Sequence, residues 1–190
     1  MTGKEKLLQS AFEGSRRDLS RLLSMIERGE ELTIPEKEYD PDYMILGITG
    51  PPGVGKSTLV GRIISYWKDR GKKVAVLAID PSSPRTGGAL LGDRLRMDSA
   101  DSGEGVFVRS LSTRGNPGGI SASLMAMSRL LAYCGWEKII IETVGSGQSE
   151  LKIVAFADKI ILVDGPDRGD IIQAENCLLY TSDAADDPYG

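Results

Sequence analysis

Short apolar runs alternate with segments of helical periodicity through most of the chain. The runs are continuously apolar, so we expect both faces of each strand to be covered. Between them, apolar residues recur at helical spacing over 56–70 and about 119–133. The pattern predicts a doubly wound α/β domain with a mainly parallel sheet. Its predicted strands are Met44–Thr49, Lys73–Ile79, Val106–Ser110, Lys138–Thr143 and Lys159–Asp164.

A different pattern precedes this domain. From Lys4 to Arg28 the apolar residues repeat at the spacing of one helix face. This predicts one amphipathic N-terminal helix, which we expect to pack on the domain, although docking on a partner would use the same face. The following stretch, 30–42, is rich in charge and contains two prolines, so it is a predicted linker. We therefore assign 1–42 to a helical extension and 43–176 to the domain.

The segment GPPGVGKST, Gly50 to Thr58, follows a predicted strand and precedes a predicted helix. This context is typical of a P-loop, in which glycines let backbone amides surround a phosphate and the helix N-terminus adds positive potential. We expect Lys56 to bridge the β- and γ-phosphates and Ser57 to ligate Mg²⁺. An ordinary strand-turn-helix corner is the alternative. The predicted nucleotide contacts are Gly50, Pro51, Pro52, Gly53, Val54, Gly55, Lys56, Ser57, Thr58 and Gly145.

Two carboxylates end predicted strands, where open α/β sheets place their ligands. Glu142 closes one strand and precedes Gly145, so we expect it to hold Mg²⁺ or its water, with the Gly145 amide near the γ-phosphate. Asp80 closes another and begins a long polar loop, in which Asp93 is a candidate for the metal shell and Arg85 for γ-phosphate stabilisation. The simpler alternatives are that Glu142 and Asp80 only shape turns and that Arg85 is solvated.

Composition removes several classes of function. Histidine is absent, which excludes histidine-dependent nucleophile triads and histidine-ligated metal sites. Cys134 and Cys177 lack ligand-like spacing, so a reducing, cytoplasmic setting is expected. Most of the formal net charge of −4 comes from 177–190, which leaves no basic footprint for nucleic acid or an anionic membrane. No apolar stretch approaches the roughly 18 residues of a membrane span, so we expect neither nucleic acid nor membrane as a partner.

Three motifs together, GITGPPGVGKSTL, AIDPSSPRTGGALLGDRLRM and IIIETVGSGQSE, resemble those of the GTPase chaperones of methylmalonyl-CoA mutase (MeaB/ArgK type). The resemblance runs from the N-terminal helix to about Ala174. It implies a P-loop GTPase that binds GTP or GDP with Mg²⁺, an adenosylcobalamin-dependent mutase as partner, and a homodimer in the full-length family. It also implies a second switch at Glu142–Glu150. The implied magnesium contacts are Ser57, Asp80, Asp93 and Glu142.

The chain departs from this family in two places. The guanine-reading motif Asn-Lys-x-Asp is absent, so guanine specificity rests on the resemblance alone. The segment CLLYTSDAADDPYG, residues 177–190, does not resemble the family. We expect this tail to be translated adapter sequence joined to a gene truncated at its C-terminal end. Independent reads that span the junction would contradict this expectation.

Hydrolysis at such a site needs charge neutralisation and an in-line water rather than covalent help from the protein. The catalytic candidates are Lys56, Glu142, Arg85 and Gln148. Ser146 follows Gly145 where many GTPases have a glutamine, so we expect slow intrinsic hydrolysis that a partner accelerates. Two alternatives stay open. One is a small-molecule kinase or ATPase, for which the chain offers no arginine-rich lid, and the other is an inactive fragment without the base-binding half.

Overall fold

The computed structural model describes residues 2–36, 42–80, 105–112, 117–143 and 157–164. Within them, five strands form one sheet in the order β3-β2-β4-β1-β5, and each neighbouring pair is parallel. The predicted parallel sheet is thereby confirmed: the bounds of β1 and β4 are the predicted ones, and those of the other three strands differ by one or two residues. The bounds are β1 Met44–Thr49, β2 Val74–Asp80, β3 Val106–Ser112, β4 Lys138–Thr143 and β5 Lys159–Leu162.

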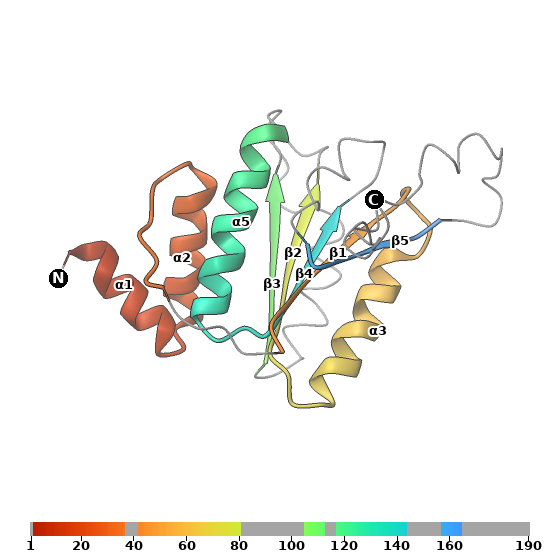
Figure 1. Ribbon diagram of the computed structural model, residues 1–190, viewed down its shortest axis with the longest axis horizontal. Coiled ribbons are helices and arrows are strands. Elements are labelled where there is room, and N and C mark those ends of the chain that lie inside the picture. Colours follow the sequence, from red (N-terminus) through yellow and green to blue (C-terminus); the bar gives the residue numbers. More distant parts are fainter. Residues whose placement is uncertain (1, 37–41, 81–104, 113–116, 144–156, 165–190) are drawn as a thin grey trace, which may run out of the picture.

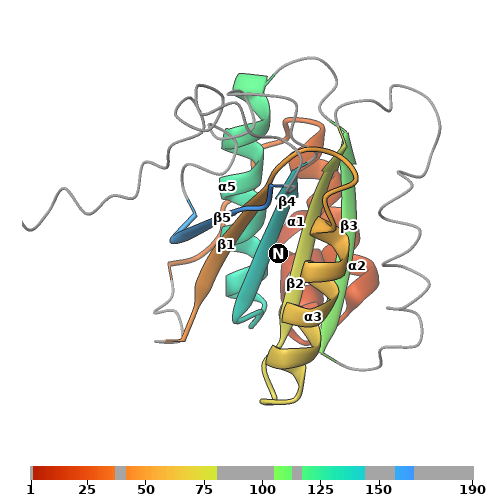
Figure 2. The ribbon, with the colours of Figure 1, turned by 90° about the vertical axis from the view of Figure 1, so that its right-hand side faces the viewer.

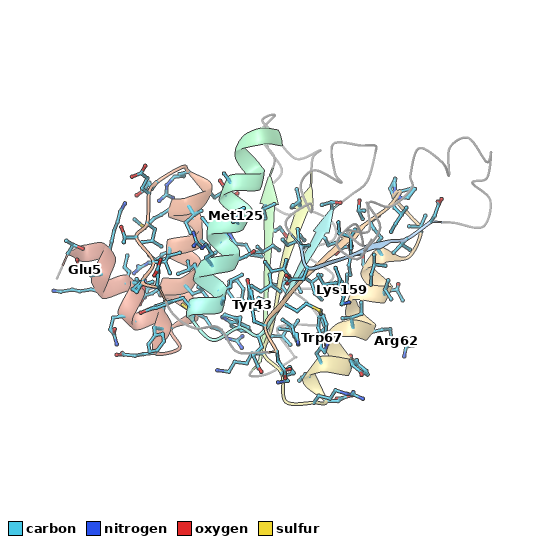
Figure 3. The ribbon with its side chains drawn as sticks, in the orientation of Figure 1. Glu5, Tyr43, Arg62, Trp67, Met125 and Lys159 are labelled. Carbon is cyan, nitrogen blue, oxygen red and sulfur yellow. The ribbon has the colours of Figure 1, made fainter. Side chains whose placement is uncertain are left out.

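Helices cover both faces of the sheet (Figure 1). Helix α3 (Lys56–Lys68) lies on one face, where its buried apolar residues, Val60 and Ile64, join an apolar cluster with β1, β2, β3 and β4. Figure 3 shows Trp67 of α3 pointing toward the sheet and Arg62 pointing away from it. Helix α5 (Pro117–Tyr133) lies on the opposite face, as Figure 2 shows with α3 in front. This is the three-layer arrangement that continuously apolar strands predict.

The strand order brings together chain segments that are far apart in the sequence. Strand β4 lies between β1 and β2, and Ile48 of β1 pairs with Glu142 of β4. Because the strands are parallel, the carboxyl ends of β1 and β4 meet at one edge of the sheet. The chain passes from β1 to β2 in one direction across the sheet and from β4 to β5 in the other. Open sheets bind ligands where the strand order reverses in this way.

The prediction of one N-terminal helix from Lys4 to Arg28 is wrong, because this segment forms two helices. They are α1 (Gly3–Phe12) and α2 (Arg16–Glu27). Gly14 has a φ of 106°, and the Ser15 hydroxyl accepts a hydrogen bond from the Asp18 amide at the start of α2. The apolar repeat continues across this turn because both helices bury residues in one cluster with α5. Periodicity alone therefore concealed the break.

The two N-terminal helices pack on the domain, as expected. Arg109 of β3 makes the polar connection: its guanidinium donates hydrogen bonds to the Ser20 carbonyl oxygen (3.1 Å) and the Ser24 hydroxyl (2.9 Å). It also forms an ion pair with Glu27 at 2.7 Å. The Phe12 ring contacts Tyr133 of α5, with ring centroids 5.2 Å apart. In the described part of the chain, no helix has the length and apolar character needed to cross a bilayer.

Replacing Arg109 with Gln should lower the free energy of unfolding by about 2 kcal/mol, because the largely buried Glu27 carboxylate loses its charged partner. Urea unfolding followed by circular dichroism measures this change. Arg129 is exposed on α5 and provides a matched control, since Arg129→Gln should change stability by less than about 0.5 kcal/mol. Equal losses in the two variants would contradict the role given to Arg109.

Candidate nucleotide-binding site

The P-loop begins where β1 ends and leads directly into α3. Gly50, Gly53 and Gly55 have φ values of 145°, 82° and 91°, which glycine adopts far more readily than other residues. Gly55 is the N-cap of α3, and no side chain caps this end of the helix. The first amides of α3 are therefore available to a ligand, and the helix dipole favours an anion there.

A neighbouring backbone carbonyl also restricts position 50 to glycine. A Cβ atom added at Gly50 would lie 1.9 Å from the carbonyl oxygen of Val163, which follows β5. The Val163 amide in turn donates a hydrogen bond to the Thr49 carbonyl oxygen at 2.8 Å. The entrance to the P-loop is thus packed against the end of β5, and this contact leaves no room for a side chain.

Lys56 places a positive charge inside the loop. Its side chain is 5% exposed, and its ammonium donates hydrogen bonds to the carbonyl oxygens of Gly50 (2.6 Å) and Pro51 (2.5 Å). Burial lowers the pKa of Lys56, and the negative charge of Glu142 opposes this shift. The predicted phosphate-bridging lysine therefore lies within the P-loop, beside the N-terminus of α3.

Glu142 lies next to the first turn of α3, as the strand order requires. It is 1% exposed, and the Ser57 hydroxyl donates a hydrogen bond to its Oε1 atom at 3.5 Å. Its Oε2 atom is buried and has no hydrogen-bond partner among the described residues. Burial raises the pKa of Glu142 to about 7, although Lys56 and Ser57 both act to lower it. This carboxylate therefore has spare acceptor capacity at a buried oxygen atom.

The oxygen atoms at this point fit magnesium. Mg²⁺ prefers hard oxygen ligands, and proteins usually hold it through one or two side chains together with substrate phosphates and waters. The Ser57 hydroxyl and the Glu142 carboxylate provide such oxygens beside the anion-binding end of α3. The described residues include no group of three His, Cys, Asp or Glu side chains able to hold a metal. A cation here would therefore depend on phosphate oxygens as well as on the protein.

Several predicted site residues lie wholly or partly outside the described residues. Asp80 is the last residue of β2, and its backbone reaches the same sheet edge as Glu142, which pairs with Ala78. The side chain of Asp80 is not described. The structure does not describe Arg85, Asp93, Gly145 and Gln148, nor the part of the second switch beyond Thr143 and the tail at 177–190. The roles given to these residues stay predictions.

Sequence reasoning missed two features beside the P-loop. One is the contact of Gly50 with Val163, for which the sequence holds no local signal. The other is a buried hydrogen bond from the Thr143 hydroxyl to the Thr49 hydroxyl, 2.8 Å long. Each threonine is the last residue of its strand, directly after Ile48 in β1 and Glu142 in β4, and this was the available signal.

The segment that contains these site residues matches a known family. The family model described as methylmalonyl-CoA mutase-associated GTPase MeaB matches residues 39–181. The chain belongs to this family. The match includes the P-loop and Glu142, and it continues past Ala174, where the resemblance was expected to end. The domain is therefore that of a P-loop GTPase.

Individual relatives agree with this membership. A putative GTPase of Pyrococcus abyssi (strain GE5 / Orsay) is 44% identical over 173 residues, which are 89% of this chain and 53% of the relative. The protein named methylmalonic aciduria type A homolog, mitochondrial, of Caenorhabditis elegans is 33% identical over 209 residues, covering 96% of this chain and 52% of the relative. The chain thus spans about half the length of these curated relatives.

A solved structure described as the crystal structure of LAO/AO transport system kinase supports the fold. Its TM-score is 0.62 at 24% identity, and the similar region covers 86% of this chain and 51% of that chain. At this level of identity the likeness concerns the architecture alone.

Replacing Gly50 with Ala should destabilise the protein by about 2 kcal/mol or more and weaken nucleotide binding, because the new Cβ would collide with the Val163 carbonyl oxygen. Gly61, inside α3, is the control. No heavy atom lies within 4 Å of a Cβ added there, so Gly61→Ala should stabilise the helix by up to about 1 kcal/mol. Urea denaturation of both variants measures this. A Gly50→Ala variant as stable as the wild type would contradict the close approach.

The stability of magnesium-free protein should depend on pH through Glu142. The folded state raises the pKa of this carboxyl from 4.5 to about 7, so it binds a proton more tightly than the unfolded chain does. The stability that this proton contributes, at most about 3 kcal/mol, is present at low pH and is lost as the pH rises through this interval. The side chain introduced in the Glu142→Gln variant stays neutral. The melting temperature of this variant should therefore exceed that of the wild type by a margin that grows from pH 4.5 to about pH 7.

Differential scanning fluorimetry in EDTA across this pH range tests the expectation. Glu13→Gln, which alters an exposed glutamate, should follow the wild type throughout. A margin for Glu142→Gln that does not change with pH would show that the carboxyl is not protonated in the folded state at mildly acidic pH.

Proposed function

We propose that this chain is the nucleotide-binding part of a magnesium-dependent GTPase that acts as a nucleotide-gated chaperone for an adenosylcobalamin-dependent methylmalonyl-CoA mutase. One observation carries the magnesium-dependent part: the Ser57 hydroxyl at the start of the P-loop helix meets the buried Glu142 carboxylate, 3.5 Å from Oε1. The family description and the name of the C. elegans relative support the mutase as partner. Because the chain spans about half of its relatives, the activity of the whole protein is part of the proposal.

The described residues of the site each have a defined task in this proposal. The amides at the start of α3 bind the phosphates, and Lys56 neutralises negative charge on the β- and γ-phosphates. Ser57 and Glu142 would hold a magnesium ion or its water, which would supply further charge neutralisation at the phosphates. Arg85 and Gln148 stay candidates for stabilising the γ-phosphate and positioning the attacking water. None of these residues forms a covalent bond to the substrate.

The choice of guanine follows from the family. The family membership favours GTP and GDP, and the chain contains no Asn-Lys-x-Asp motif to read the base. A homodimer and a cytoplasmic location likewise stay predictions. A small-molecule kinase or ATPase would use the same P-loop, and an inactive fragment would keep the P-loop without binding a base.

Thermal shifts with GTP, GDP and ATP in magnesium should distinguish these functions. We expect stabilisation by GTP and GDP well above that by ATP, reaching about 2.7 kcal/mol at a hundredfold excess over Kd. Selectivity for ATP would indicate a kinase or ATPase, and no shift with any nucleotide would indicate an inactive fragment. Turnover by the isolated chain faster than about 1 s⁻¹ would contradict slow, partner-dependent hydrolysis.

The magnesium dependence has its own matched pair of variants on one helix. Ser57→Ala should abolish most of the additional stabilisation that magnesium gives to bound nucleotide, while Ser65→Ala should leave it unchanged. Ser65 is exposed on α3, and its hydroxyl bonds to the Gly61 carbonyl oxygen at 3.1 Å, away from Glu142. Equal behaviour of the two variants would remove Ser57 from the metal site.

A further inference from the structure

We propose that the hydrogen bond between Thr49 and Thr143 is a positioning device that sets the distance between the P-loop and Glu142. The inference deepens the proposed function, on which it rests, by adding two residues that act on the site without touching it. The Thr143 hydroxyl donates to the Thr49 hydroxyl at 2.8 Å, and the two side chains are 1% and 3% exposed.

The position of the pair in the sheet gives it this role. Ile48 pairs with Glu142, so Thr49 and Thr143 lie side by side at the next step along the two parallel strands. Each is the last residue of its strand. Gly50 and the P-loop follow Thr49 directly, and the predicted second switch begins at Glu142. The hydroxyl pair is therefore a side-chain link between the two strands where they reach the nucleotide site.

Thr49 is held from both sides at this point. Its hydroxyl accepts the bond from Thr143 of β4, and its carbonyl oxygen accepts a bond from the Val163 amide beyond β5. Thr143 follows Glu142 directly, and side chains alternate across a strand, so the threonines point to the opposite face from Glu142. The pair therefore contacts neither Ser57 nor the phosphate-binding amides. Any influence on the site must pass through the strands themselves.

A hydroxyl pair holds two strands closer than an apolar pair does. Two methyl groups in contact are about 4 Å apart, whereas the two hydroxyl oxygens are 2.8 Å apart. Replacing the hydroxyls with methyls would thus widen this contact by about 1 Å. The hydrogen bond of Ser57 to Glu142 is already 3.5 Å long, so a change of this size moves the carboxylate beyond hydrogen-bonding reach of the hydroxyl.

Four variants and one control separate a positioning role from a merely structural one. Thr49→Val and Thr143→Val remove one hydroxyl each at nearly constant shape. The Thr49→Val/Thr143→Val double variant removes both, so no buried hydroxyl is left without its partner and most of the stability should return. Thr143→Ser keeps the donor. Ser128→Ala is the matched control, since the Ser128 hydroxyl is buried on α5 without a partner among the described residues.

The measurement is the affinity for a fluorescent GDP analogue in magnesium and in EDTA, with urea unfolding of the same samples. In each Val variant and in the double variant, we expect the factor by which magnesium raises the affinity to fall about tenfold. Losses of this size are typical when residues that orient metal ligands are changed. Affinity in EDTA should change by less than about twofold, because the phosphate-binding amides are untouched. Thr143→Ser and Ser128→Ala should behave as the wild type.

The outcomes distinguish this inference from the proposed function. A double variant that regains both stability and the magnesium-dependent gain would make the pair purely structural and overturn the inference. Val variants that match a magnesium-responsive wild type would also overturn it, while leaving the proposed function intact. A wild type that shows no magnesium-dependent gain would remove the proposed function and the inference together. If a single Val variant does not fold, Thr143→Ser and the double variant still decide between these results.

Discussion

The parallel pairing of β1 with β4 is the contact on which the candidate site depends. It places Ile48 opposite Glu142 and so brings the first turn of α3 beside an acid that lies 85 residues from Ser57 in the sequence. Neither strand forms the site alone. The P-loop supplies amides and a lysine for an anion, and β4 supplies the carboxylate that the proposed function assigns to the cation of a bound nucleotide.

Lys56, at the start of α3, and Glu142, in β4, are both buried. Burying a charge is costly unless it has partners. Lys56 has two loop carbonyls, whereas Glu142 has a single long contact and an Oε2 atom with no described partner. The helices on the two faces keep water from the strands, so the desolvation of these charges lowers the stability of the folded protein. A ligand that brings a cation to Glu142 and negative charge to Lys56 would relieve both.

Local sequence patterns predicted the elements of the fold well, but not the contacts between them. The strands could be read because residues such as Ile139–Ile141 are apolar on both faces, and the P-loop because its spacing is required by phosphate geometry. The order of the strands could not, since it is set by packing between distant segments. The turn at Gly14 and Ser15 was missed because the apolar repeat runs through it. The hydrogen bond between Thr49 and Thr143 needs the register of two strands, which no single segment contains.

Gly50 has a consequence for how the motif itself is understood. The first glycine of a P-loop is usually explained by the approach of a phosphate, but here the carbonyl of Val163 already occupies the space of a side chain. The residue is thus demanded by the architecture before any ligand is considered. The same contact ties the first residue of the phosphate loop to the edge strand β5, so a shift of β5 relative to β1 would move the entrance of the loop with it.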